Sequence, residues 1–308
     1  MIMGSERVLD LFSGMGGLSS GFSRAGFETT GVDMSDGIGM SYRKFTGSDD
    51  FRNINLLTTS VYGRYDIIVG GPPCKPWSPV NHSRRGRDHG DFKLLGRYFD
   101  HVLRIMPRIF ILENVPLLRR DPEFDAQLKR AESSGYSVAW KVVRYSDFGA
   151  ATARRRLIAV GTMEGAASEF MEALDLQKGH AKTVRDEIGK YTGLKRGEEE
   201  DHVWPELKTV QKYREKYASG KYGWSILQWD RPAPSFGNVM KTYILHPDSD
   251  LDGGYRPVSV LEVSRIMGFN HGFSFPGGLG MGMRYQMLVN SVSPVFSEAL
   301  AKTVAGWP

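Results

Sequence analysis

The stretch that decides the fold is Val8-Leu9-Asp10-Leu11-Phe12-Ser13-Gly14-Met15-Gly16-Gly17. The apolar run over 8–12 predicts a buried strand, the glycines that follow predict a tight turn, and residues 18–25 have helical spacing. Asp33 follows at the end of a second short strand, predicted over 29–32. A strand, a glycine turn, a helix and then an acidic residue are typical of nucleotide-binding α/β proteins, in which the carboxylate accepts hydrogen bonds from ribose hydroxyls. The turn alone leaves a dehydrogenase open.

Strand and helix patterns alternate through the first half of the chain. Short apolar runs bounded by turn residues predict further buried strands, and the spacing of Leu95, Tyr98 and Val102 predicts a helix. Such alternation predicts an α/β fold, with a parallel sheet and helices on both of its faces. The further strands are expected over 66–69, 108–112, 137–143 and 157–160, and the helix over 94–105.

The pattern changes after Gly161, where the chain becomes irregular and rich in Lys, Tyr, Trp, Gly and Pro. We therefore divide it into a sheet domain over 1–161, a smaller irregular region over 162–280, and a terminal helical segment over 281–308. The acidic run 198–201 in the second region is interpreted as a solvated loop.

Composition favours an intracellular globular protein that meets a polyanion. The chain has 308 residues, of which 41% are apolar and 24% charged, and its formal net charge is +5. No apolar stretch is long enough for a membrane span, the N-terminus lacks signal-peptide features, and one free cysteine suits a reducing compartment. We therefore expect a cytoplasmic protein.

Basic residues cluster at 84–87, 154–156 and 208–221, and together they favour phosphate contacts over merely solvated faces.

The single cysteine, Cys74, lies in the run Gly70-Gly71-Pro72-Pro73-Cys74-Lys75-Pro76-Trp77-Ser78. A lone thiol cannot form an internal disulfide or a multi-cysteine metal site. Its neighbours are prolines and glycines rather than the apolar residues that surround a packed thiol, so Cys74 is a candidate nucleophile. A small buried residue is the alternative. Because the loop follows a strand, it is expected at the carboxyl edge of the sheet, where such folds bind ligands.

Glu113, Arg154 and Arg156 are candidates for the same crevice. Glu113 ends another predicted strand; if it is desolvated, its pKa would rise and it could donate a proton. A glutamate that caps a helix or pairs with an arginine is the alternative. Strand alternation places Arg154 and Arg156 on one face and Arg155 on the other.

A thiol, a carboxylic acid and arginines beside a nucleoside pocket favour one reaction. A thiolate can add to C6 of a pyrimidine if N3 is protonated during the attack. The addition makes C5 nucleophilic, and C5 can then accept an electrophilic methyl group. An arginine can hold the ring carbonyl and lower the barrier electrostatically.

These motifs resemble those of the DNA cytosine-5 methyltransferases, and the resemblance extends over nearly the whole chain. Six motifs agree with the family in order and spacing. They are Asp10 to Gly17, Gly71-Pro72-Pro73-Cys74 with Ser78, Glu113-Asn114-Val115, the pair Arg154 and Arg156, Arg256 to Glu262 with Gly268-Phe269, and Asn290-Ser291-Val292.

The resemblance implies a Rossmann-like, S-adenosylmethionine-dependent methyltransferase sheet with a small irregular target-recognition domain. It implies Cys74 as the nucleophile, Glu113 as the acid at N3 and N4, and Arg154 or Arg156 at O2 of a cytosine flipped out of the duplex. S-adenosylmethionine would be the methyl donor, with S-adenosylhomocysteine as product and no metal. The residues that would line its pocket are Phe12, Gly14, Gly16, Asp33, Met34, Asn53, Ile54, Asn290 and Val292.

Duplex DNA is the partner that the resemblance implies, with a cognate restriction endonuclease as a candidate partner and a monomer as the expected state. The segments 183–186 and 229–232 resemble those that bracket the recognition region in compact family members. Within it we expect one amphipathic helix with Val210, Tyr213 and Tyr217 facing inward. The residues expected to contact DNA around the flipped base are Lys75, Ser78, Asn81, Arg84, Arg85 and Arg87.

Some positions depart from the family pattern. Thr152 stands where the family has glutamine, Val289 replaces a glycine, and Asn53 stands where an aspartate meets the adenine amino group. An amide oxygen can still accept that hydrogen bond, so weaker cofactor binding is expected. Two other functions stay open: cytosine-5 methylation of tRNA, and a slow DNA-binding regulator with the same fold.

Overall fold

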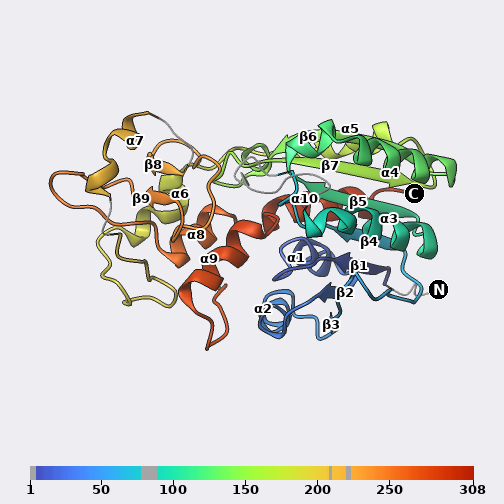
Figure 1. Cartoon of the computed structure of the whole chain (residues 1–308), viewed down its shortest axis with the longest axis horizontal. Coiled ribbons are helices and arrows are strands. Elements are labelled where there is room, and N and C mark those ends of the chain that lie inside the picture. The colour runs from blue at the N-terminus through green and yellow to red at the C-terminus, as the bar shows by residue number, and fades with distance from the viewer. Residues whose placement is uncertain (1–4, 78–88, 208–209, 220–222) are drawn as a thin grey trace. The chain divides into compact units, whose positions relative to one another are not determined.

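The computed structural model describes residues 5–77, 89–207, 210–219 and 223–308 (Figure 1). The chain forms two compact units, each described here by itself. Unit 1 comprises Met1–Arg144, Arg155–Lys178 and Phe296–Pro308, and unit 2 comprises Tyr145–Arg154 and Gly179–Val295.

A seven-stranded sheet forms the centre of unit 1. Every strand that the sequence predicts is present in it, and one short strand at the edge is additional. In order across the sheet, the strands are β3 (Phe51–Asn53), β2 (Glu28–Asp33), β1 (Arg7–Leu11), β4 (Ile67–Gly70), β5 (Ile109–Asn114), β7 (Arg155–Thr162) and β6 (Ser137–Arg144).

The expectation of a wholly parallel sheet is wrong at one edge. β1 to β5 pair in parallel, whereas β7 is antiparallel to both of its neighbours, β5 and β6. A parallel neighbour requires a crossover of a dozen or more residues, usually through a helix. Between β6 and β7 the chain has only residues 145–154, which contain one short 3-10 helix (Tyr145–Phe148), so β7 returns in the opposite direction.

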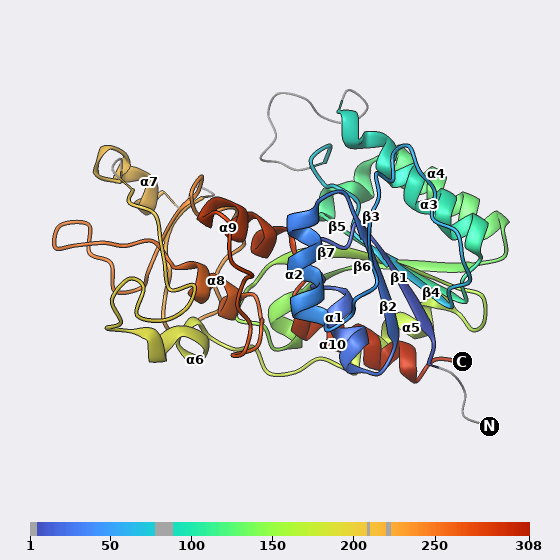
Figure 2. The same ribbon diagram turned by 90° about the horizontal axis from the view of Figure 1, so that it is seen from below.

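Helices cover both faces of the sheet, as predicted. Figure 2 shows α3 (Lys93–Ile105) and α4 (Pro122–Ser133) on one face, and α1 (Ser19–Arg24), α5 (Ala167–Asp175) and α10 (Pro294–Ala305) on the other. α2 (Asp36–Thr46) connects β2 to β3. Because both faces are covered, the central strands read as apolar runs, and β4 and β5 are buried throughout.

Unit 2 contains little regular structure, and buried charges organise much of it. Glu262 accepts two hydrogen bonds of 2.8 Å from Arg256, and Asp201 accepts from Arg284 at 2.6 Å. Asp201 is buried, so the solvated-loop interpretation is wrong for this residue, although 198–200 are exposed. The regular elements are α6 (Val184–Ile188), α7 (Glu215–Ala218), α8 (Val260–Ile266), α9 (Met281–Asn290) and a parallel pair of strands, β8 (Trp224–Ile226) and β9 (Tyr243–Leu245).

Two helices expected from the sequence are divided in the structure. The amphipathic stretch forms a 3-10 turn (Gln211–Tyr213) followed by α7, and its tyrosine rings pack edge-on against Trp224. The terminal stretch forms α9 and α10 rather than one helix. Pro294 accounts for the second division, because proline disfavours helical conformation in the residue before it and suits the first turn of a new helix.

Candidate active site

Cys74 lies in the loop that leaves the carboxyl end of β4, as predicted. Its side chain is partly buried, and the Trp77 amide donates a hydrogen bond of 3.0 Å to the Cys74 carbonyl, which closes a tight turn after the thiol. Before the thiol, the side-chain amide of Asn114 donates to the Pro72 carbonyl at 3.0 Å. The loop is therefore held by hydrogen bonds on both sides of Cys74.

Glu113 and Arg156 form a nearly buried ion pair beside this loop. Glu113 lies in β5 and Arg156 in the neighbouring strand β7; Arg156 Nε is 2.7 Å from Glu113 Oε1, and the two side chains are 10% and 11% exposed. A Cβ added to Gly71 would lie 3.1 Å from Glu113 Oε2, so the carboxylate reaches the loop that carries Cys74. The pairing with an arginine, kept as an alternative for Glu113, is present.

Burial raises the pKa of the Cys74 thiol. The positive charge of Arg156 lowers this pKa, the negative charge of Glu113 raises it, and Lys75 lowers it further. A thiol with a raised pKa is mostly protonated at neutral pH, so a thiolate must form when a substrate binds. Cys74, Glu113 and Arg156 therefore act on one another electrostatically, as a catalytic group would require.

The glycine turn after β1 has an open backbone at Gly14, whereas Gly16 packs closely against Thr46 and Tyr42. Phe12, Gly14 and Gly16 all have positive φ angles, of 61°, 53° and 88°. Nothing lies within 4 Å of a Cβ added to Gly14, so a ligand can approach the backbone there. Asp33 Oδ2 accepts from the Gly14 amide at 2.9 Å and Oδ1 from the Met34 amide at 2.7 Å. Each oxygen retains a lone pair for a ligand hydroxyl.

The residues expected around an adenine ring gather where β2 and β3 end. Asp33 is paired in register with Asn53, and the Ile54 amide donates to the Asp33 carbonyl at 2.8 Å. The Asn53 amide nitrogen donates to Asp36 Oδ1 at 2.7 Å, which directs its oxygen elsewhere as an acceptor. Met34 is 63% exposed, and its side chain is accessible to a ligand. The chemistry of this donor and acceptor set fits an adenosine.

Asp10 is a buried carboxyl group beneath the glycine turn that the sequence analysis did not assign. It accepts a hydrogen bond of 2.6 Å from the Ser19 hydroxyl, which in turn accepts from the Tyr42 hydroxyl at 3.0 Å. Burial, with a smaller contribution from the nearby Asp33 carboxylate, raises the pKa of Asp10 to about 7, although the hydrogen bond from Ser19 lowers it. Asp10 is therefore a neutral acid below pH 7 and a buried anion above it.

Asp10→Asn is expected to stabilise the protein at high pH. The unfolded chain loses this proton near pH 4 and the folded chain near pH 7, so stability falls as pH rises between these values. A pKa difference of this size corresponds to a loss of stability of about 4 kcal/mol at most. The asparagine amide lacks a complete set of hydrogen-bond partners, so only about 1–3 kcal/mol of this loss should be recovered. Urea unfolding should show the gain at pH 8 and little gain at pH 4.5.

The control for this variant is Asp50→Asn, because Asp50 also accepts a hydroxyl hydrogen bond, from Thr30, but is exposed. A stability difference between wild type and Asp10→Asn that is equal at the two pH values would contradict the assignment of Asp10.

Of the remaining candidates, Lys75 lies in unit 1, and the others lie in unit 2 or outside the described residues. Arg154 is buried and donates from Nη2 to the Val289 carbonyl of α9 at 2.5 Å, while Arg155 is exposed, in agreement with the predicted alternation. Asn290 Oδ1 accepts from Gln286, and Val292 is buried. Lys75 is described and lies 3.8 Å from Asp91 Oδ2. Outside the described residues lie Ser78, Asn81, Arg84, Arg85 and Arg87.

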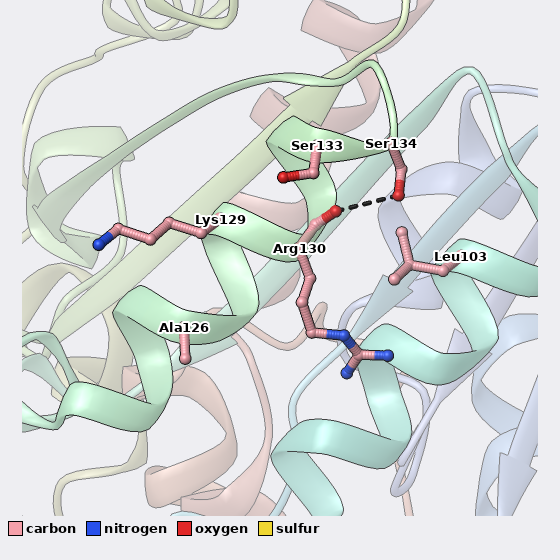
Figure 3. Close-up of a pocket in the computed structure, with 6 residues that line it drawn as sticks. All are labelled: Leu103, Ala126, Lys129, Arg130, Ser133 and Ser134. Carbon is pink, nitrogen blue, oxygen red and sulfur yellow. Dashed lines mark hydrogen bonds between the residues drawn. The ribbon is translucent and has the colours of Figure 1, made fainter.

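A surface pocket of about 470 Å³ between α3 and α4 contains none of the candidates (Figure 3). Its lining includes Leu103 and Arg130, and the Ser134 hydroxyl donates to the Arg130 carbonyl at 3.0 Å.

Across the described residues no cluster of three His, Cys, Asp or Glu side chains could hold a metal ion. In the same part of the chain, no helix has the length and apolar character needed to cross a bilayer.

Three supporting residues near the thiol were missed from the sequence. Asn114 and Trp77 belong to sequence motifs described above, but their hydrogen bonds join separate loops and do not follow from the sequence. Asp121 belongs to none of those motifs. The Asp121 carboxylate accepts from the Trp77 indole at 2.6 Å.

Comparison with known proteins identifies the family of the chain. Residues 6–306 match the family model described as C-5 cytosine-specific DNA methylase. Type II methyltransferase M.FnuDI of Fusobacterium nucleatum is 28% identical, over 97% of this chain and 94% of that protein. Type II methyltransferase M.MthTI of Methanothermobacter thermautotrophicus is 29% identical, over 96% of each chain.

Solved structures share the fold. The Entamoeba histolytica methyltransferase EhMeth has a TM-score of 0.73 at 17% identity and covers 98% of each chain. The Dnmt2 methyltransferase of S. pombe has a TM-score of 0.71 at 16% identity, covering 98% of this chain and 99% of that one. The fold class and family inferred from the sequence are thereby confirmed: the chain belongs to the C-5 cytosine-specific DNA methylases, a family of S-adenosylmethionine-dependent enzymes.

Proposed function

We propose that the chain methylates C5 of a cytosine flipped out of a short duplex DNA site, through a covalent bond between Cys74 Sγ and C6 of the ring. The observation that carries this proposal is the grouping of the Cys74 loop with the Glu113–Arg156 ion pair at one edge of the sheet. A thiol nucleophile beside a nearly buried carboxyl group is what addition to a protonated pyrimidine requires.

Each residue has a separate task in this reaction. The Glu113 carboxylate takes the proton of the Cys74 thiol when the cytosine binds. The thiolate then forms the S–C6 bond while the protonated Glu113 delivers that proton to N3, and the C5=C6 electrons become available at C5. Arg156 holds Glu113 in place, and Arg156 or Arg154 stabilises the ring oxygen O2. After C5 has gained the methyl group, water accepts the C5 proton, the C5=C6 bond re-forms, and the Cys74 sulfur leaves with the electrons of the S–C6 bond. N3 then returns its proton to Glu113.

S-adenosylmethionine, when bound, supplies the electrophilic methyl group. In unit 1 the positive-φ turn after β1 and the Asp33 carboxylate support binding of its ribose and amino acid portions, and Asn53 supports binding of its adenine. The full set proposed for this pocket is Phe12, Gly14, Gly16, Asp33, Met34, Asn53, Ile54, Asn290 and Val292.

We propose further that residues 1–161 carry the catalytic and cofactor functions, 162–280 choose the DNA sequence, and 281–308 return to the catalytic domain. Lys75 and the basic segment after Ser78 would contact DNA phosphates beside the flipped base. The Type II relatives support a role in restriction and modification, with a monomeric enzyme, a cognate endonuclease and action in the cytoplasm as the corresponding proposals.

Incubation with labelled S-adenosylmethionine and either duplex DNA or tRNA tests the function. We expect label in duplex DNA, and bisulfite sequencing of DNA from cells that express the chain should place 5-methylcytosine at one short sequence. Label in tRNA alone would replace the proposal by the RNA alternative. DNA binding without label in either substrate would favour a regulator.

A further inference from the structure

A hydrogen bond connects the segment after Cys74 to the segment after Glu113. Trp77 is 7% exposed, and its indole Nε1 donates to Asp121 Oδ2 at 2.6 Å. Asp121 follows the 3-10 helix (Pro116–Arg120) that comes directly after β5. Because β5 ends with Glu113 and Asn114, this bond joins the loop that carries the thiol to the segment that follows the acid.

Asp121 is itself held firmly by the backbone. Its second carboxylate oxygen, Oδ1, accepts from the Glu123 amide at 2.9 Å and caps the N-terminus of α4. The Asp121 amide donates to the Leu118 carbonyl at 2.9 Å. An aspartate fixed at a helix N-cap is a rigid acceptor, so the indole that it binds is also held in one place.

Trp77 transmits this rigidity to the thiol. The Trp77 amide bonds to the Cys74 carbonyl at 3.0 Å, so a fixed indole also fixes the turn that presents the sulfur. The Trp77 ring also packs on Phe92, with 5.8 Å between ring centroids. On the other side of Cys74, the bond from Asn114 to Pro72 forms a second link to the chain after Glu113. The loop is thus hydrogen-bonded before and after Cys74, through Pro72 and Trp77, to the single segment that contains Asn114 and Asp121.

We propose that Trp77 and Asp121 are positioning residues that set the place of the Cys74 sulfur relative to Glu113. This inference rests on the proposed function, in which a thiolate attacks while the acid protonates the same ring. Attack requires the sulfur within a few tenths of an ångström of its best approach, and a displacement of about 1 Å can cost about 100-fold in rate.

The test is a double-mutant cycle with Trp77→Phe, Asp121→Asn and the double variant. Trp77→Phe retains a ring against Phe92 but removes the N–H donor. Asp121→Asn retains a good helix cap, because its oxygen can accept from Glu123, but turns its amide donors toward the indole. The matched control is Trp307→Phe, since Trp307 also packs on a phenylalanine, Phe170, and donates its indole N–H to the Glu164 carbonyl at 3.1 Å in the same unit.

Two measurements report on the thiol. The first is the rate of covalent trapping by a duplex oligonucleotide that contains 5-fluorocytosine. We expect each single variant to trap on the order of tenfold more slowly at saturating DNA, with KM for DNA changed by less than about twofold. The double variant should be no slower than the slower single variant, because both changes remove one interaction. Trp307→Phe should trap at the wild-type rate.

The second measurement is alkylation by iodoacetamide as a function of pH, which reports on Cys74 alone because the chain has one cysteine. Burial raises the pKa of this thiol, with Arg156, Glu113 and Lys75 as the charged groups that act on it. A loosened turn should admit water and lower the alkylation midpoint toward that of an ordinary thiol. Thermal unfolding of each variant identifies general destabilisation.

The outcomes separate the two proposals. If both single variants trap and alkylate like Trp307→Phe, the positioning role is overturned while the proposed function stands. If effects of Trp77→Phe and Asp121→Asn simply multiply in the double variant, the two residues act independently and the tether is also overturned. A wild-type chain that neither methylates DNA nor forms the trapped adduct overturns the proposed function, although the alkylation midpoints still test the contact.

Discussion

Cys74→Ala is expected to abolish methyl transfer to duplex DNA. The proposed reaction begins with a bond from Sγ to C6, and no other cysteine exists in the chain to replace it. Loss of a nucleophile costs several orders of magnitude, so turnover should fall by about 10⁴-fold or more. Incorporation of labelled methyl groups measures this directly, and 5-fluorocytosine DNA should no longer become covalently attached to the protein.

The control for Cys74→Ala is cofactor binding. The glycine turn after β1 and Asp33 at the end of β2 lie outside the Cys74 loop, so the affinity for S-adenosylmethionine measured by calorimetry should change by less than about twofold. Cys74→Ser places a poorer nucleophile at the same position and should be nearly as inactive as Cys74→Ala. Normal turnover in either variant would refute the assignment of the nucleophile.

Glu113→Gln is expected to have the second-largest effect. The variant keeps the size of the side chain but cannot deliver a proton to N3, and general acid catalysis contributes about 10²- to 10⁴-fold. It also leaves the nearly buried Arg156 guanidinium without its anionic partner, 2.7 Å away in the wild type. Removal of one member of a buried pair costs about 3–5 kcal/mol, so urea unfolding should show a clear loss of stability as well.

Two further variants serve as controls, one for the loss of stability and one for a changed carboxylate elsewhere in the unit. Arg156→Met removes the other member of the ion pair, and it should lose comparable stability while the Glu113 carboxyl group is kept. Glu123→Gln, in α4 of the same unit, changes a carboxylate that accepts from Gln127 and should leave turnover unchanged. A turnover of Glu113→Gln within about threefold of wild type would show that Glu113 is not the proton donor.

Local pattern predicted the elements whose signal does not depend on distant contacts. The apolar run after Arg7 and the run before Glu113 are buried on both faces of the sheet, so burial alone marks them as strands. The same pattern missed α2, α4 and α5, whose periodic apolar signal is weaker than that of α3. Composition does not distinguish an antiparallel strand from a parallel one, so the direction of β7 was missed, although the short connection from β6 over 145–154 already indicates an antiparallel neighbour.

Charged residues were the least predictable part of the candidate site. Arg154 and Arg156 are alike in sequence, yet Arg156 pairs with Glu113 and Arg154 binds the Val289 carbonyl. Asp201 looked like part of a solvated run and is buried against Arg284. The burial of a charge is decided by whether a partner is present in space, and a single sequence does not record that partner.

The sequence by itself determined the family and the α/β architecture and supplied the residues proposed to carry the chemistry, because spaced motifs need particular atoms at particular strand ends. Only the tertiary structure decided how those atoms are held: Glu113 by Arg156, Asp33 by the glycine turn, and the turn after Cys74 by Trp77 and Asp121. The physical reason is that hydrogen bonds and ion pairs act over about 3 Å in space, whatever the separation of the residues along the chain.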